Sequence, residues 1–128
     1  MADLRRASKN EQKKMVCVAT ADIDFEDIND DAIVFTLPID SVIVRAYVLE
    51  LTTATTSSTC DITVGTTTVV NEGALDASGE LTVIYADAPT GGNVTISDGA
   101  TAPTAGTFRF IFEYVEYTKT TGEYTTVG

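Results

Sequence analysis

The sequence predicts an all-β fold, an antiparallel two-sheet sandwich that is jelly-roll-like and has about eight strands. Apolar and polar residues alternate with a period of two in segments 42–51, 59–64 and 107–117, which is the pattern of half-buried strands. Threonine, with 22 copies, is the most over-used residue, and its β-branched side chain favours a pleated surface. Turn residues punctuate the chain and no helical period is present, so 128 residues fit one sandwich domain.

The first half of the chain contains three expected strands. Residues 15–25 alternate and form the first, residues 26–31 (EDINDD) are expected to be a loop, and residues 32–37 form a short strand before Pro38. The longest expected strand covers residues 41–54. Both of its faces are mostly apolar, so we expect both to be covered.

The second half contains five more. Residues 59–65 and 66–70 are expected to form a hairpin across Gly65, and residues 71–79 a loop or one helical turn. The remaining expected strands are 80–86, 93–98 and 107–118. The last one places Phe108, Phe110, Phe112 and Tyr114 on one face and Arg109, Ile111, Glu113, Val115 and Tyr117 on the other.

Charge divides the chain into a basic arm and an acidic body. Residues 1–14 carry a net charge of +3, whereas residues 15–128 carry −14. We therefore divide the chain into an extended arm (1–14), a sandwich (15–118) and a tail (119–128) that either stays a tail or adds a short edge strand. An acidic body repels nucleic acid and anionic membranes, so we expect neither as a partner. The plainer alternative for the arm is a solvated terminus.

The two cysteines are expected to be reduced, unbridged and buried. The apolar stretch from Met15 to Ala21 is short and lacks leucine, which favours a strand over a secretion signal. Without export, disulfides are not expected. Cys17 and Cys60 each alternate with apolar neighbours, as small core residues do.

The sequence supports no enzyme, and we expect no catalytic, cofactor-binding or metal-binding residues. There is no histidine, which removes the commonest general base. The acidic cluster at 22–31 begins like a calcium loop, but Asp27 stands where glycine is needed and Ile33 where the bidentate glutamate is needed. A looser calcium site at the sandwich edge, or a solvated loop that keeps the strand edge from pairing, remain the alternatives.

The order of strands and corners resembles the small virion structural proteins of tailed bacteriophages. The pattern is a strand ending in "LP", a strand with valines at alternating positions, a short strand ending in "VG", and a closing strand of the form AG-x-F-x-F-x-x-x-Y. It is carried by Leu37, Pro38, Val42, Val44, Gly65, Ala105, Gly106, Phe108, Phe110 and Tyr114. The resemblance covers about residues 32–117 and implies a β-sandwich that coats or completes a capsid, as a decoration (cement) protein does. The basic N-terminus departs from the pattern.

From this resemblance we expect a protein that docks on the capsid surface of a virion and is made in the host cytoplasm. Its expected partners are the major capsid protein and further copies of itself, as a dimer or trimer. The expected capsid-contact residues of the arm are Leu4, Arg5, Arg6, Lys9, Lys13 and Lys14. Tyr47, Ile111 and Tyr117 are expected at a subunit interface, unless they form the other side of the sandwich core.

Three alternatives remain open on sequence alone. The chain fits another virion component, such as a head–tail or tail accessory protein. It also fits a carbohydrate- or cell-binding module, which requires an exposed aromatic platform or bound calcium. A hydrolase that uses the acidic cluster is the third.

Overall fold

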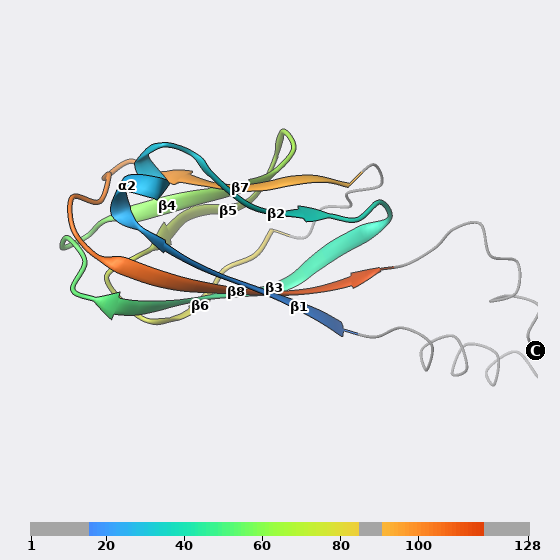
Figure 1. Cartoon of the computed structure of the whole chain (residues 1–128), viewed down its shortest axis with the longest axis horizontal. Coiled ribbons are helices and arrows are strands. Elements are labelled where there is room, and N and C mark those ends of the chain that lie inside the picture. The colour runs from blue at the N-terminus through green and yellow to red at the C-terminus, as the bar shows by residue number, and fades with distance from the viewer. Residues whose placement is uncertain (1–15, 85–90, 117–128) are drawn as a thin grey trace, which may run out of the picture.

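A computed structural model describes residues 16–84 and 91–116 of the chain, and these form two packed antiparallel sheets (Figure 1). The elements are β1 (Val16–Asp24), α2 (Phe25–Asn29), β2 (Ala32–Leu37), β3 (Ser41–Thr52), β4 (Thr59–Val64), β5 (Thr67–Ala74), β6 (Gly79–Leu81), β7 (Gly92–Asp98) and β8 (Thr107–Glu116). The predicted all-β sandwich is confirmed.

The strand order is that of a jelly roll. The first sheet has the order β1-β8-β3-β6 and the second the order β2-β7-β4-β5. Strand β1 pairs with β8, β2 with β7, β3 with β6 and β4 with β5. These four antiparallel pairs together form one long double-stranded ribbon. The β3–β8 pair joins its segments within the first sheet and the β4–β7 pair joins them within the second, as in a jelly roll.

The core lies between the two sheets and is dominated by one row of rings. Phe108, Phe110 and Phe112 of β8 are fully buried, and the centroids of neighbouring rings lie 6.3 Å apart. Strand β4 contributes Cys60, Ile62 and Val64 from the opposite sheet, all buried. The alternation predicted for both strands is thus confirmed.

The segment predicted as a loop at 26–31 begins with a helical turn, so that prediction was wrong. Asp24 is the N-cap of α2: its carboxylate accepts a hydrogen bond from the Asp27 backbone N–H, and the Asp27 carboxylate accepts one from the Asp24 N–H. This reciprocal capping box satisfies two backbone donors at the helix start. Ile28 then fills the end of the sandwich and is fully buried.

Several predicted strand boundaries also differ from the observed ones, most clearly in β5, β6 and β3. Strand β5 runs to Ala74, into the predicted loop, because Gly73 and Ala74 continue the ladder opposite Cys60 and Thr59. Strand β6 is shorter than predicted, since its three residues, Gly79–Leu81, are the ones that pair with β3. Strand β3 ends at Thr52 rather than at residue 54.

The expectation that both faces of β3 are covered is wrong within the described residues. The inward face is buried through Ile43, Ala46 and Val48. No described element packs over the outward face, where Arg45 and Leu49 are exposed. The first sheet therefore has one core face and one outer face.

The two ends of the sandwich differ in what is attached to them. Val16 pairs with Val115, so β1 begins where β8 ends, at the end of the sandwich remote from α2 (Figure 1). The predicted arm (1–14) and tail (119–128) lie outside the described residues, but both connect to the domain at this end. In the described part of the chain, no helix is long and apolar enough to cross a membrane.

Candidate functional site

The outer face of the first sheet is the strongest candidate for a functional surface. Register places alternate residues of four strands on it, and we call this surface the Ile111 face after its central residue. Its members are Val16, Val18, Thr20 and Asp22 of β1, Val42, Arg45, Tyr47 and Leu49 of β3, Glu80 of β6, and Arg109, Ile111, Glu113 and Val115 of β8. Val16 and Val18 are 56% and 61% exposed, so the face presents apolar side chains to its surroundings.

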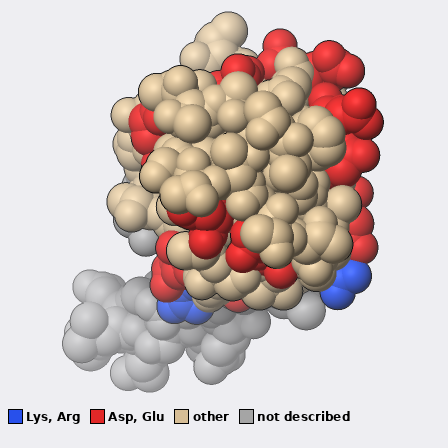
Figure 2. Space-filling view, turned by 90° about the vertical axis from the view of Figure 1, so that its left-hand side faces the viewer, with Lys and Arg blue, Asp and Glu red and all other residues tan. Residues whose placement is uncertain are grey.

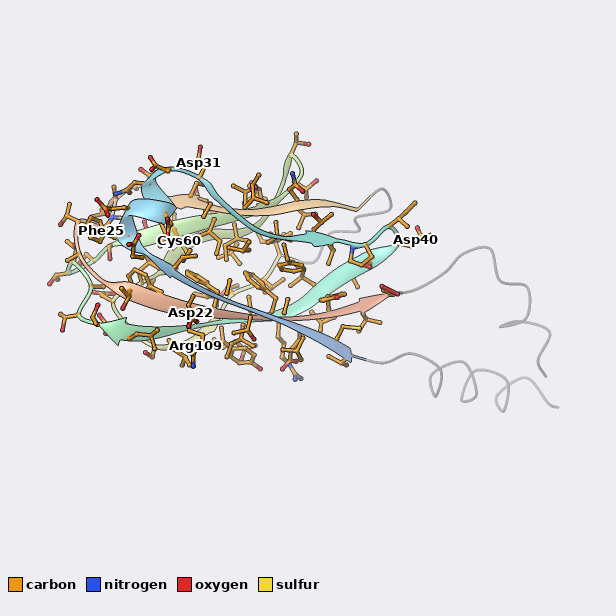
Figure 3. The ribbon with its side chains drawn as sticks, in the orientation of Figure 1. Asp22, Phe25, Asp31, Asp40, Cys60 and Arg109 are labelled. Carbon is orange, nitrogen blue, oxygen red and sulfur yellow. The ribbon has the colours of Figure 1, made fainter. Side chains whose placement is uncertain are left out.

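Two ion pairs flank Ile111 on this face. Arg109 donates from Nε to Asp22 Oδ1 at 2.7 Å and from Nη2 to Asp22 Oδ2 at 2.8 Å, a two-bond fork from β8 to β1. These hydrogen bonds lower the pKa of Asp22. Figure 3 shows Asp22 and Arg109 together on the side of the first sheet that faces away from the second sheet.

The second ion pair joins β8 to β3. Arg45 Nη1 lies 3.3 Å from Glu113 Oε1. Electrostatic interaction with Tyr47, and to a smaller extent with Glu113, raises the pKa of the Arg45 guanidinium. Because each arginine on the face stands beside a carboxylate, both positive charges are compensated locally.

These two arginines are the whole positive charge of the described residues. The ranges 16–84 and 91–116 contain Arg45 and Arg109 against fifteen aspartates and glutamates, a net charge of −13. In Figure 2 the blue atoms lie at the lower edge of the view, on the side of the first sheet, and red atoms gather along one flank. The Ile111 face is therefore close to neutral on a body that is otherwise acidic.

The outer face of the second sheet has a different chemistry, and we call it the threonine face. Its members are Ile33 of β2, Asn93, Thr95 and Ser97 of β7, Thr59, Asp61 and Thr63 of β4, and Thr68 of β5. These side chains are short and mostly hydroxylic. Ile33 is its large exposed apolar residue, at 61% exposure.

Three carboxylates of the acidic cluster near α2 have structural roles. A depression of about 250 Å³ is lined by Asp22, Asp24, Asp27 and neighbours. Asp22 holds Arg109, whereas Asp24 and Asp27 form the capping box. No group of three or more metal-ligating side chains occurs in ranges 16–84 and 91–116.

We therefore expect calcium to leave the stability of the protein unchanged. A site that binds calcium only in the folded state would raise the melting temperature by mass action. Differential scanning fluorimetry with millimolar calcium, and with magnesium as the control, is expected to give melting temperatures within about 1 °C of each other. A clear rise with calcium alone would contradict this prediction.

Glu72 is a structural carboxylate that the sequence did not single out. It sits at a φ of +57° in β5 and accepts hydrogen bonds from the Ala100 N–H at 2.9 Å and from Thr59 Oγ1 at 2.8 Å. Its own N–H donates to Asp61 Oδ1 at 2.8 Å. The hydrogen bonds from Ala100 and Thr59 lower the pKa of Glu72. Through these contacts the Glu72 carboxylate connects β5 to β4 and to the loop after β7.

Both cysteines are thiols in the structure, and they differ in burial. The predicted burial is confirmed for Cys60, which is fully enclosed, whereas Cys17 is half-buried. Burial, with smaller contributions from the charges of Asp61 and Glu72, raises the pKa of Cys60 from 9.0 to about 12.

Cys60 is expected to make the fold sensitive to alkali. Below pH 9 the thiol is protonated in both states and its contribution to stability is fully present. Between pH 9 and pH 12 the unfolded chain loses this proton and the folded chain keeps it, so the free energy of unfolding falls by up to about 1.4 kcal/mol per pH unit.

Urea unfolding at a series of pH values measures this slope. Cys60→Ala is expected to flatten it. An identical alkaline slope in the wild type and Cys60→Ala would show that the Cys60 thiol is not its source.

Of the predicted interface residues, the structure brings two together. Tyr47 and Ile111 are register partners on neighbouring strands of the Ile111 face, whereas Tyr117 and all six arm residues lie outside the described residues. Sequence reasoning placed Arg109 on the same side of its strand as Ile111, but it missed that Val18 and Asp22 of β1 belong to the same surface. The alternation within β1 and within β8 indicates which side chains share a face of each strand. The pairing of the two strands, which brings together residues 87 positions apart, could not be predicted from the sequence.

Comparison with known proteins gives a similarity at the level of the fold. No family model and no curated protein matches the sequence. Among solved structures, the chain is similar to a chain in the acid-stable capsid structure of the Helicobacter pylori bacteriophage KHP30, with a TM-score of 0.58 and 14% identity. The match covers 80% of this chain and 91% of that chain. The protein therefore shares its fold with a chain of a bacteriophage capsid structure.

Proposed function

We propose that this protein is a non-enzymatic structural protein of a bacteriophage virion, and that it docks on the capsid surface as a decoration (cement) protein. The observation that carries the proposal is the jelly-roll sandwich, which matches a chain of a phage capsid structure over most of both lengths. The fold recurs in viral capsid proteins. Among the carboxylates near α2, Asp24 and Asp27 form the helix cap and Asp22 pairs with Arg109, so each of these three has a structural partner.

The basic arm is the proposed capsid-binding segment. Five cations at Arg5, Arg6, Lys9, Lys13 and Lys14 precede a domain whose described part carries a net charge of −13. An acidic patch on a neighbouring subunit of the shell attracts the arm and repels the domain, so the arm supplies the favourable electrostatic contacts. Many such weak contacts, repeated over a lattice, add up to stable attachment.

Removing the arm tests this function. Capsids purified without the protein are mixed with the full chain or with a variant lacking residues 1–14, and bound protein is measured by co-sedimentation. Each exposed charge contact contributes about 0.2–1 kcal/mol, so losing five is expected to weaken binding by roughly fivefold or more. Circular dichroism should show an unchanged strand spectrum, because β1 begins at Val16.

A charge-neutralised arm provides the matched control for chain length. Glutamine at the five cationic positions is expected to reproduce part of the loss, and wild-type binding is expected to fall as salt rises, since salt screens exposed charges within about 10 Å at 0.1 M. Undiminished decoration by the truncated protein would refute the role of the arm. Binding to tails or to glycans instead of capsids would favour a tail accessory protein or a carbohydrate-binding module.

A further inference from the structure

We propose that the Ile111 face binds a second copy of this chain, face to face and with two-fold symmetry. The proposal goes beyond the proposed function, which concerns docking on the capsid. It concerns the free protein in solution and needs neither a capsid nor the arm.

Electrostatics selects a second copy as the occupant. The described body carries −13, so most approaches of two copies bring acidic surfaces together and are repulsive. The Ile111 face is where Arg45 and Arg109 neutralise their carboxylate neighbours. The face also carries the apolar residues Val16, Val18 and Ile111. When two copies meet through this face, apolar area is buried and no net negative surface faces another.

The order of charges along β8 specifies the geometry. Arg109 and Glu113 lie on the same face, two residues before and two residues after Ile111. A two-fold axis that runs across the strands at Ile111 reverses the strand direction between the copies. Arg109 then lies opposite Glu113 of the partner subunit, and symmetry makes this contact twice. An axis along the strands would instead oppose like charges, so the charge pattern favours the antiparallel arrangement.

The size of the face predicts a weak dimer. The three long strands of the face are spaced about 4.8 Å apart and are roughly 30 Å long, which gives a footprint on the order of 500 Å². A standard stable interface buries about 800 Å² per partner. The expected association is therefore in the micromolar range or weaker, and it becomes effective where copies are concentrated on a lattice.

Sedimentation of the full chain from about 1 µM to about 1 mM tests the proposal. The wild type is expected to pass from monomer to dimer over this range. Val18→Asp, on the Ile111 face, is expected to raise the dissociation constant at least tenfold. Ile33→Asp is the matched control, because both residues are 61% exposed and both lie in edge strands, but Ile33 belongs to the threonine face; it is expected to leave the dissociation constant within about twofold.

Charge reversal tests the geometry. Arg109→Glu opposes two carboxylates and is expected to weaken the dimer at least tenfold, whereas Arg109→Glu combined with Glu113→Arg restores each opposed pair and is expected to return the dissociation constant to within about threefold. The single variant loses the internal pair of Arg109 with Asp22, and the double variant also loses the pair of Glu113 with Arg45, so the midpoint of urea unfolding should be lowered in both. If Arg109 and Glu113 only stabilised the fold, association and stability would change together. Recovery of association in the double variant without recovery of stability therefore indicates a contact between the two copies.

Three results would overturn the proposal. The first is a monomer at every concentration, which includes the case in which the chain's own residues 117–128 cover the face. The second is a dimer that Val18→Asp leaves intact or that Ile33→Asp weakens equally. The third is failure of the double charge reversal to restore association. A failure of capsid binding alone would count against the proposed function and not against this interface.

Discussion

Replacing Phe110 with alanine is expected to reduce the free energy of unfolding by about 3–5 kcal/mol, the usual cost of emptying a buried phenylalanine site. Phe110 is fully buried, and its ring lies between those of Phe108 and Phe112 with centroids 6.3 Å away on either side. Truncation removes the middle ring of this row and leaves a cavity that its rigid neighbours fill poorly. Small domains have only about 5–15 kcal/mol of stability in total, so the variant should approach the unfolding threshold.

Urea unfolding followed by circular dichroism measures this loss. Ile111→Ala is the matched control, because Ile111 is the next residue of β8 and points to the outer face of the sheet. It is expected to cost about 1 kcal/mol, in keeping with partial burial. Equal losses at the two positions would mean that the core of the sandwich does not lie on the phenylalanine side of β8.

Replacing Gly91 with alanine is expected to cost roughly 3–4 kcal/mol, combining a left-handed backbone with an overpacked contact. Gly91 has a φ of +67°. A Cβ atom there would lie 2.5 Å from the carbonyl oxygen of Leu37 and 2.9 Å from the backbone nitrogen of Ile39. Both are backbone atoms at the β2–β3 turn, so relief requires one chain segment to move.

Gly65→Ala separates the two contributions. Gly65 has a similar φ of +60°, but no atom of the described residues lies within 4 Å of the place that a Cβ atom would take there. This variant should therefore show the left-handed backbone cost alone, about 1–2 kcal/mol. The same urea titration measures the free energy of unfolding of both variants. Similar losses would show that the segment around Leu37 moves at little energetic cost to accommodate a side chain at position 91.

The residues of β8 show how much of the fold was predictable from local pattern. Alternation placed Phe108, Phe110 and Phe112 on one face and Arg109 and Ile111 on the other, and the structure confirms both assignments. Side chains of a strand point to opposite faces in turn, so this information is carried by each short segment alone. The hairpin across Gly65 was predictable for the same reason, because its two strands are neighbours in sequence.

The helical turn α2 was missed, although its local signals were present. Asp24 and Asp27 have the spacing of a capping box and Ile28 is the apolar residue that the turn buries. A single turn has too little internal hydrogen bonding to persist by itself. It forms here because the open end of the sandwich accepts Ile28, and that end exists only in the folded protein.

The candidate interface shows the limit of sequence reasoning most clearly. Tyr47 and Ile111 were predicted as interface residues from their place on the second faces of long strands, and the structure makes them neighbours. Whether that face is covered was mispredicted, because an apolar outward face looks the same in sequence whether the chain covers it or leaves it for a partner. The Arg109–Asp22 fork spans 87 positions, so no local pattern could reveal it.

The sequence by itself determined the strand-forming character of this protein, the inward and outward sides of regular strands such as β4 and β8, and the separation of a basic arm from an acidic body. These properties follow from residue types and from the two-residue period of a strand, which are local. The tertiary structure alone decided the strand order, the end of the sandwich where the arm and tail attach, and the gathering of both described arginines on one apolar face. These depend on pairings between distant segments, such as β1 with β8, whose register is set by packing of the whole core.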